Sequence, residues 1–403
     1  MKRIEEKLSQ FGSKPGLERM EKLMESLGNP QDELKVIMVG GTNGKGSTTS
    51  CISSILSAAG YRTGSYYSPH LIRYNERFRI NGKEITDKVF EEYEDDVLRL
   101  FDRGSKMTEF EALTAIAYRY FADEKADFAV MEIGMGGEFD AVNITKPEAG
   151  IITNVELEHT EFLGDTIGQI VRTKAGIMKH ARQRITGCSG QALEVLESLY
   201  PVRVLERDFF VEPVELNGER TVFDYLGKTF YHSLELPLLG RHQIDNAALA
   251  IAAIESLDET VKEDSVRKGL LDAQNPGRLQ VISKEPLIVI DAAHNPAGIG
   301  ALVTNISLFD YDRLIVVFGV MARKDWGTML KIIGQHADTF IINQPKDKGA
   351  AESRLVAKES AQYCETVEVP DVLQSLEKAK SLAGKKDMIL VCGSIYMLGE
   401  LLG

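Results

Sequence analysis

A glycine-rich loop between a short strand and a helix is the feature that most constrains this sequence. The apolar run 36–39 predicts a buried strand, and a helix rich in small residues is expected from Ser47 to near Gly60. Glycines let the backbone between them wrap closely around phosphate oxygens, and the N-terminus of the helix favours anions. The loop therefore predicts a nucleoside triphosphate site. The residues expected to bind the triphosphate are Gly41, Thr42, Asn43, Gly44, Lys45, Gly46 and Ser47.

The spacing of this loop differs from the standard P-loop. That pattern has a glycine where Val39 stands and a serine or threonine where Gly46 stands. A plain glycine-rich turn is the alternative interpretation. The strand before the loop, the mobile charge of Lys45 within it and the hydroxyl-rich helix after it favour the phosphate site.

Strand and helix signals alternate around the loop, which predicts a parallel, doubly wound sheet flanked by helices. Three short strands separated by turns then suggest an antiparallel addition at the edge of that sheet. Strands are expected at 128–133 and 150–155, helices at 17–27, 87–101, 109–121, 167–178, 243–257 and 261–273, and the three short strands at 211–214, 221–225 and 229–232.

The segment 274–277, Gln-Asn-Pro-Gly, is the clearest linker signal in the 403 residues. A second alternating series follows it, with strands expected at 287–290, 314–318, 339–342 and 388–391. We therefore expect an α/β protein of two domains. Residues 1–275 would form a P-loop-type domain with a mostly parallel sheet and a small antiparallel addition. Residues 276–403 would form a smaller, Rossmann-like α/β domain.

Charge and composition disfavour several classes of partner. The net charge of −13 disfavours nucleic acid and anionic membranes, since both attract basic surfaces. The four cysteines are far apart, without the spacing of metal ligands or of a disulfide framework. The charged N-terminus lacks a signal-peptide core, and the apolar stretch 247–254 is too short to span a bilayer. We expect a cytoplasmic monomer.

Polar residues follow other expected strands, where ligand loops of α/β sheets lie. Ser68 opens an irregular stretch, for which an ordinary surface loop is the alternative. Glu132 ends an apolar strand, and burying its carboxylate is costly unless it meets a cation, which beside a triphosphate would be Mg²⁺. A solvated strand end explains Glu132 equally well. His159 is either a metal ligand or a capping residue.

Three further positions remain ambiguous from the residues alone. Lys174 lies on an expected helix, where a solvated side chain is the simplest expectation. The segment 291–296 follows the first strand of the second domain and has the same strand-exit position as Glu132. Ser394 would cap the terminal helix, and its place at a strand exit also admits substrate binding.

Taken in order, these motifs resemble the Mur ligase superfamily, and within it the folylpolyglutamate synthases, which in many bacteria are also dihydrofolate synthases. The matching segments cover nearly the whole chain. They are GTNGKGS (41–47), SPHLIRYNERF (68–78), TEFEALT (108–114), EIGMGGEFDAVN (132–143), ITNVELEHTEFLGDT (152–166), KAGIMK (174–179), GRHQIDNAALA (240–250), NPGRLQ (275–280), DAAHNP (291–296), FGVMARKDW (318–326) and GSIYMLGE (393–400).

The resemblance implies an ATP-binding N-terminal domain, a smaller C-terminal domain and an active site between them. It also implies roles for particular residues. Mg²⁺ would be held by Ser68, Glu132 and His159, Lys174 would be carbamylated, and ATP would also contact Asn246, Arg278 and Asp291. The folate or pteroate acceptor would contact Thr108, Glu109, Phe110, Glu111, Phe139, Asp140 and Ala141, and the incoming glutamate would contact His294, Ser394 and Tyr396.

The implied reaction is ATP-dependent addition of L-glutamate to tetrahydrofolate or dihydropteroate. A carboxylate is a poor acyl donor, so transfer of the γ-phosphate would first make an acyl phosphate, which the glutamate amine then attacks. Lys45, Arg278 and Mg²⁺ would neutralise charge on the transferred phosphoryl group, with Lys174 and His294 as further catalytic residues. Domain closure about 275–277 would exclude water.

Departures from the family pattern keep other acceptors open. Ala292 replaces a usual glycine, Arg323 stands where an acidic residue is common, and Glu138 stands where arginine is frequent. The change at Glu138 reverses a charge beside the implied acceptor pocket. The alternatives are a related Mur-type ligase that acts on another carboxylate and a nucleotide-binding regulatory protein without ligase activity.

Overall fold

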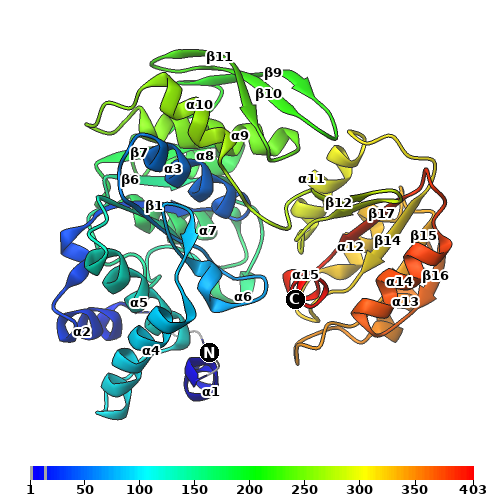
Figure 1. Ribbon diagram of the computed structural model, residues 1–403, viewed down its shortest axis with the longest axis horizontal. Coiled ribbons are helices and arrows are strands. Elements are labelled where there is room, and N and C mark those ends of the chain that lie inside the picture. Colours follow the sequence, from blue (N-terminus) through cyan, green and yellow to red (C-terminus); the bar gives the residue numbers. More distant parts are fainter. Residues whose placement is uncertain (1–2, 13–15) are drawn as a thin grey trace. The chain divides into compact units, whose positions relative to one another are not determined.

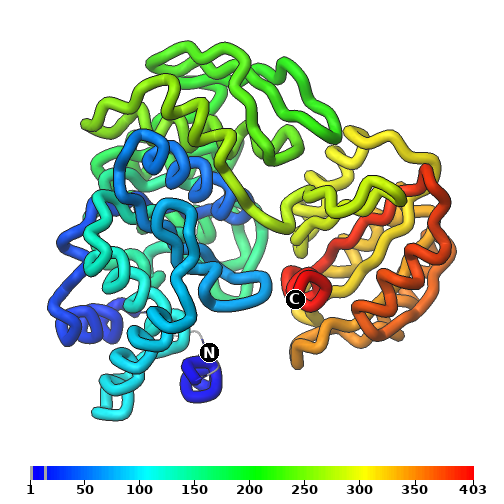
Figure 2. Tube along the Cα trace, in the orientation of Figure 1, coloured from blue at the N-terminus to red at the C-terminus, as the bar shows by residue number. Residues whose placement is uncertain are grey.

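The computed structural model describes residues 3–12 and 16–403, which divide into two compact units. Unit 1 comprises Met1–Val214, Val222–Pro237 and Gln243–Gln274, and unit 2 comprises Glu215–Thr221, Leu238–His242 and Asn275–Gly403. Figure 2 follows the chain from blue to green through most of unit 1 and from yellow to red through most of unit 2. The domain boundary at residue 275 stays a prediction.

Unit 1 is built on an eight-stranded sheet in the order β4-β3-β2-β5-β1-β6-β7-β8. Figure 1 labels β1, β6 and β7 of this sheet. The mostly parallel sheet that the alternating pattern predicts is confirmed. Its parallel strands are β1 (Lys35–Gly40), β2 (Thr63–Tyr66), β5 (Phe128–Glu132), β6 (Ala149–Ile152), β7 (Gln183–Thr186) and β8 (Arg203–Val204). Because β1 lies between β5 and β6, the sheet grows in opposite directions from this point, which is where such sheets bind ligands.

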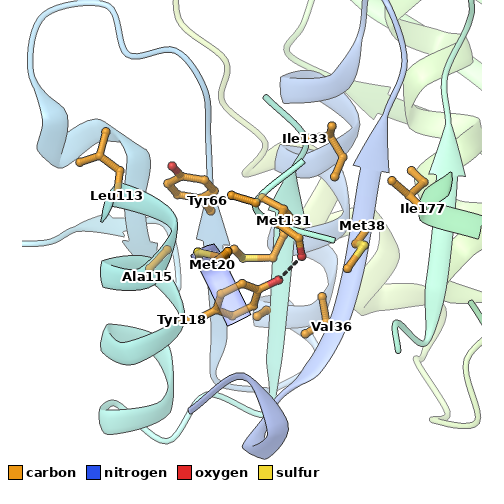
Figure 3. Close-up of a cluster of buried hydrophobic side chains, with 14 of the residues drawn as sticks. Met20, Val36, Met38, Tyr66, Leu113, Ala115, Tyr118, Met131, Ile133 and Ile177 are labelled. Carbon is orange, nitrogen blue, oxygen red and sulfur yellow. Dashed lines mark hydrogen bonds between the residues drawn. The ribbon is translucent and has the colours of Figure 1, made fainter. Parts of the chain in front are cut away.

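Helices cover both faces of this sheet. On one face α3 packs against β1, β2, β5 and α10, and on the other α2 and α5 cover an apolar cluster. Figure 3 shows Met20, Tyr118 and Met131 meeting in that cluster, where the Tyr118 hydroxyl donates a 2.7 Å hydrogen bond to the Val142 carbonyl. The helices of unit 1 include α1 (Arg3–Leu8), α2 (Glu18–Ser26), α3 (Lys45–Ala58), α4 (Asp87–Asp102), α5 (Glu109–Asp123), α6 (Thr160–Leu163), α7 (Ile167–Lys174), α8 (Gly190–Glu197), α9 (Arg241–Ile254) and α10 (Glu263–Leu271).

The antiparallel strands differ from expectation. The strands β9 (Phe210–Leu216), β10 (Thr221–Leu226) and β11 (Phe230–Leu236) form a sheet of their own, so the interpretation as an edge addition is wrong. The edge of the main sheet is instead extended antiparallel by β3 (Phe78–Ile80) and β4 (Lys83–Glu84), which are too short to leave a pattern.

Unit 2 contains a six-stranded sheet in the order β12-β13-β17-β14-β15-β16, parallel except for β12. The four expected strands are present as β13 (Leu287–Ile290), β14 (Leu314–Phe318), β15 (Thr339–Ile342) and β17 (Met388–Cys392). Two edge strands, β12 (Gln280–Lys284) and β16 (Glu365–Glu368), were not expected because they are largely polar. The helices are α11 (Pro296–Ile306), α12 (Trp326–Ile333), α13 (Ser353–Ser360), α14 (Val372–Leu382) and α15 (Ile395–Leu402).

Across the two described stretches of the chain, no helix has both the length and the apolar character that a membrane crossing needs.

The contact between α3 and α10 generates a stability prediction. A Cβ at Gly269 would lie 2.3 Å from the Ile55 Cα, which is backbone and cannot move aside. Gly269→Ala should therefore force the helices apart and lower the free energy of unfolding by about 1–3 kcal/mol. Thermal unfolding followed by circular dichroism measures this change. Gly300→Ala is the matched control: a Cβ there meets open space within α11, so roughly 0.5–1 kcal/mol of stabilisation is expected. Equal effects at the two positions would contradict the packing argument.

Candidate active site

The glycine loop leaves the end of β1 in a conformation that only glycine can adopt at two positions. Gly41 has φ +138°, and a Cβ there would lie 1.9 Å from the Thr153 Oγ1. Gly44 has φ +84°, and its Cβ would lie 2.2 Å from the Asn246 Oδ1. Because Gly44 is the N-cap, α3 begins at Lys45, two residues before the expected start at Ser47.

The segment after β6 clamps this loop. The Asn43 backbone N–H donates to the Asn154 Oδ1 at 3.0 Å, and the Asn154 Nδ2 returns a 3.1 Å bond to the Asn43 carbonyl. The Thr153 hydroxyl donates to the same carbonyl at 2.6 Å. Sequence reasoning selected only His159 from this segment. Polar residues directly after an apolar strand were the available signal for Thr153 and Asn154.

Two lysines converge on the loop. The Lys45 Nζ donates to the carbonyls of Gly41 and Thr42 at 3.2 and 3.1 Å, and the Lys174 Nζ donates to the Gly41 carbonyl at 2.8 Å. Lys174 is only 5% exposed, so the expectation of a solvated side chain is wrong. Burial, with the charge of Lys45, lowers the pKa of Lys174 to about 7. A lysine with this pKa is partly neutral, and hence nucleophilic, near neutral pH.

Gly137 and Gly176 allow the segment that carries Lys174 to pack closely against residues 137–138, which buries Lys174. A Cβ at Gly137 would lie 2.6 Å from the Lys174 carbonyl oxygen, and one at Gly176 would lie 2.4 Å from the Glu138 Cα. The Glu138 backbone N–H donates to the Thr173 carbonyl at 2.8 Å. The two backbones therefore interlock, and this contact fixes where the Lys174 side chain starts.

Glu132 and Ser68 form an oxygen-rich pair beside the loop. Glu132 ends β5, which pairs with β1 through Glu132 and Val39, and it is 5% exposed, so a solvated strand end is excluded. Its Oε2 accepts a 3.1 Å hydrogen bond from the Ser68 backbone N–H. The Ser68 Oγ is buried without a hydrogen-bond partner, which an ordinary surface loop does not explain. A buried carboxylate next to an unsatisfied hydroxyl oxygen fits a hard divalent cation.

His159 lies at the start of α6, but its side chain makes no capping hydrogen bond to that helix. The residue is the N-cap with φ +53°, no side-chain capping bond is present, and its Nε2 lies 3.9 Å from the Glu158 Oε1. The capping interpretation is therefore wrong, and the role as a metal ligand stays a prediction. Within residues 3–12 and 16–403, no group of three or more His, Cys, Asp or Glu residues is arranged to hold a metal.

Several residues expected to bind the acceptor have structural partners. Thr108 and Glu111 form a capping box at α5, with bonds of 3.2 and 2.7 Å, and Glu111 also pairs with Arg19 at 2.7 Å. Glu109 accepts a 2.6 Å hydrogen bond from the Tyr74 hydroxyl. The polar groups of this segment therefore organise the start of α5.

The other residues expected to bind the acceptor differ in their exposure and in their structural contacts. Asp140 is buried and accepts backbone hydrogen bonds from Met135 and Val142 at 2.9 and 3.0 Å. Burial raises the pKa of Asp140 to about 6. Ala141 is buried and Phe139 is 52% exposed. Phe110 packs against Gly134, where a Cβ would lie 2.5 Å from the ring.

The expected C-terminal residues lie together at the carboxyl ends of β13 and β17 in unit 2. Asp291 accepts hydrogen bonds from the backbone of Leu279 and Ala293 at 2.8 and 2.7 Å. Ser394 caps α15 by accepting a 3.2 Å bond from the Tyr396 N–H, as expected, and the His294 Nδ1 lies 2.9 Å from the Ala292 carbonyl. Arg278 belongs to unit 2 as well, whereas Asn246 belongs to unit 1.

The fold and the two lysines on a phosphate loop define an ATP-dependent ligase of the Mur type. Residues 39–189 match the Mur ligase middle domain, and residues 277–395 match the Mur ligase glutamate ligase domain. The chain is 33% identical over 97% of its length to the dihydrofolate synthase/folylpolyglutamate synthase of Bacillus subtilis, and it covers 95% of that protein. It belongs to the folylpolyglutamate synthase/dihydrofolate synthase family, as its motifs predict.

Solved structures agree with this assignment. A Mycobacterium tuberculosis folylpolyglutamate synthase complexed with ADP superposes with a TM-score of 0.93 at 30% identity, over 98% of this chain and 96% of that one. An Escherichia coli relative in complex with DHPP and ADP gives 0.88 at 29% identity, covering 97% and 93%. A bifunctional synthase with Mn, AMPPNP and L-glutamate bound gives 0.88 at 28% identity, covering 98% and 95%. The predicted fold class and enzyme class are confirmed.

The curated relatives differ in length. A probable bifunctional folylpolyglutamate synthase/dihydropteroate synthase of Haloferax volcanii is 33% identical over 98% of this chain, which spans only 49% of that protein. The chain therefore spans about half the length of that relative.

The clash at Gly44 predicts how the loop responds to substitution. Gly44→Ala should weaken binding of AMPPNP, measured by titration calorimetry, at least tenfold, because the new methyl group collides with the Asn246 amide and distorts the loop. Gly60→Ala is the matched control at the other end of α3: its φ is +95°, but a Cβ there meets open space. Both changes carry the left-handed strain of about 1–2 kcal/mol. Equal AMPPNP affinities in Gly44→Ala and Gly60→Ala would show that the loop is not part of the nucleotide site.

Proposed function

We propose that this chain joins L-glutamate to the carboxylate of tetrahydrofolate, and also of dihydropteroate, with release of ADP and phosphate. One observation carries the proposal: the amines of Lys45 and Lys174 meet at the carbonyl of Gly41, on a phosphate loop whose neighbouring strand ends in the buried Glu132. A loop that only binds a nucleotide needs no second, buried lysine. A ligase that transfers a phosphoryl group needs charge stabilisation on more than one side.

The reaction proceeds in two steps. A carboxylate oxygen of the acceptor attacks the γ-phosphorus of ATP, and ADP leaves, which gives an acyl phosphate. The α-amine of glutamate then attacks the acyl carbon and loses a proton, and inorganic phosphate leaves with the carbon–oxygen electron pair. The Lys45 ammonium, held over the loop by two carbonyls, opposes the charge on the phosphoryl group during the first step.

Mg²⁺ is the divalent cation that we assign to the site. Ser68 and Glu132 supply the oxygens that such an ion prefers, and His159 would complete the protein ligands. When bound, the ion neutralises the phosphate oxygens. The chain's own part is to hold the Glu132 carboxylate in place, which the Ser68 N–H does by donating a hydrogen bond to it.

Lys174 is proposed to be carbamylated. Its amine nitrogen would bond to the carbon of CO₂ and lose a proton, so a buried cation becomes an anion beside the metal site. Burial supports this because it favours the neutral amine, which is the form that reacts with CO₂.

The remaining assignments rest on position in the fold. Asn246 supports ATP binding because its amide packs on Gly44. Arg278, which lies between the linker and β12, is proposed as an ATP contact, together with Asp291. His294, Ser394 and Tyr396, at the carboxyl ends of β13 and β17, are proposed to bind glutamate. The expected cytoplasmic location, the monomeric state and the absence of nucleic-acid partners stay predictions.

Phosphate release tests the proposal directly. Purified protein with ATP, L-glutamate and either dihydropteroate or tetrahydrofolate should release phosphate only when both glutamate and an acceptor are present. Lys45→Ala should retain the fold and lower this rate about a hundredfold or more, because it removes the charge over the phosphates. Lys83→Ala, an exposed lysine on β4, is the control.

The outcomes separate the alternatives. Phosphate release that needs glutamate but another carboxylate acceptor would indicate a related Mur-type ligase. ATP turnover that ignores every acceptor would indicate a regulatory nucleotide-binding protein. Wild-type turnover in Lys45→Ala would refute the role of the loop.

The carbamate predicts a dependence on pH and CO₂. Below about pH 7 the Lys174 amine is protonated and cannot attack CO₂, so stimulation by added bicarbonate should fade as the pH falls through 7. With ¹³C-bicarbonate, the wild type should show a carbamate resonance that Lys174→Arg lacks, whereas Lys331→Arg, an exposed control on α12, keeps it. The same resonance in Lys174→Arg would assign the modification elsewhere.

A further inference from the structure

The linker at 274–277 starts from the helix that carries the phosphate loop. It follows α10, which packs along α3 (Figure 1). The two helix backbones touch at Gly269, where a Cβ would lie 2.3 Å from the Ile55 Cα. Gln274 is the last residue of unit 1, and Asn275 begins the long continuous part of unit 2. The phosphate loop and the base of this linker are therefore both supported by α3.

Ser50 on α3 holds the start of the linker through a hydroxyl that bonds in both directions. Its Oγ donates a 2.8 Å hydrogen bond to the Gln274 carbonyl and accepts a 2.9 Å bond from the Gln274 backbone N–H. A serine inside a helix commonly bonds to its own helix, as Ser53 and Ser57 do here. Ser50 instead bonds to a residue 224 positions away and satisfies both backbone polar groups of that residue.

A second pair of hydrogen bonds holds the other end of the linker within unit 2. The Gly277 carbonyl accepts a 2.8 Å bond from the Ala292 N–H, and the Gly277 N–H donates a 2.9 Å bond to the Gln280 Oε1. Ala292 stands between Asp291 and His294, which are the proposed contacts of ATP and glutamate at the end of β13. This end of the linker is therefore fixed to the substrate-binding segment of unit 2.

Only Asn275 and Pro276 separate the two held positions. A proline ring fixes its own φ and disfavours helical backbone for the residue before it. Few soft torsions remain between the two pairs of hydrogen bonds. A rotation at this linker is therefore confined to a narrow path, whose starting point is the position of Gln274 on α3.

The proposed reaction requires groups from both units. Lys45 precedes Ser50 by five residues on α3, about 7.5 Å along the helix axis, whereas His294 belongs to unit 2. An acyl phosphate formed at the phosphate loop must meet the glutamate amine before water reaches it. The linker joins the supports of these two groups through two residues, so a shift of its start changes where unit 2 arrives.

We propose that Ser50 is a positioning residue of the ligase reaction. By holding Gln274 on α3, it sets the pivot from which unit 2 brings its glutamate-binding segment to the phosphate loop. Ser50 acts through the linker and not through a contact with a substrate. The inference rests on the proposed function and adds to it a residue outside the expected substrate contacts. Without the Ser50 hydroxyl, ATP still binds, but unit 2 reaches the reactive arrangement less often.

Ser50→Ala tests this role because it removes both hydrogen bonds and leaves the phosphate loop intact. With ATP, L-glutamate and dihydropteroate, kcat for phosphate release should fall about tenfold, the size expected for two ordinary hydrogen bonds. The KM for ATP and the AMPPNP affinity from titration calorimetry should stay at wild-type values. Hydrogen exchange at the Gln274 amide should become faster, which reports the lost contact independently of activity. Ser57→Ala is the matched control on the same helix and should change none of these values.

A second variant acts on the same joint without touching α3. Pro276→Ala frees the fixed φ at an exposed position, so it should also lower kcat and spare AMPPNP affinity. Because both changes loosen one joint, the double variant should lose less than the product of the two single losses. Losses that multiply would contradict a shared joint.

The remaining outcomes separate this inference from the proposed function. Wild-type kcat in Ser50→Ala, or a fall in kcat matched by an equal loss of AMPPNP affinity, would overturn the positioning role and leave the ligase assignment intact. A wild-type protein that releases no phosphate with dihydropteroate or tetrahydrofolate would overturn the proposed function itself.

Discussion

The hydrogen bond from the Lys174 Nζ to the Gly41 carbonyl is the contact on which the arrangement of the site depends. It joins the end of α7 to the loop after β1, two segments 133 residues apart in sequence. It holds an amine in a buried position close to a second lysine, and both effects favour its neutral form. The glycines at 137 and 176 allow this arrangement because a Cβ at either position would clash with the backbone of the facing segment. The buried position of Lys174 therefore depends on two residues without side chains.

The loop itself is held by the segment that follows β6. Thr153 and Asn154 satisfy the Asn43 backbone at both its N–H and its carbonyl. Preorganised backbone donors lose little freedom when an anion arrives, which is how a glycine-rich segment avoids the entropic cost of its own flexibility. The residues after β6 therefore fix the conformation of the loop by hydrogen-bonding to its backbone.

Local sequence patterns predicted much of the fold. Apolar strands, helical spacing and strand-exit polar residues were enough to predict the α/β class, the glycine-rich loop between β1 and α3, and the strand-end positions of Glu132 and Ser394. They failed where the cause lies in distant packing. The burial of Lys174 needs Gly137, and the clamp on Asn43 needs residues more than a hundred positions away. The polar strands β12 and β16 lack the apolar run by which buried strands are recognised.

Each of the two units is assembled from separate segments of the chain, which affects the order in which they can fold during translation. Residues 215–221 and 238–242 belong to unit 2, but the chain then returns to complete unit 1 with α9 and α10. A ribosome therefore releases these two segments before residues 275–403, which make up the rest of unit 2, and the last helices of unit 1 emerge after them. Neither unit can be cut out as one continuous stretch. During translation from the N-terminus, unit 2 can be completed only after residues 275–403 have been synthesised.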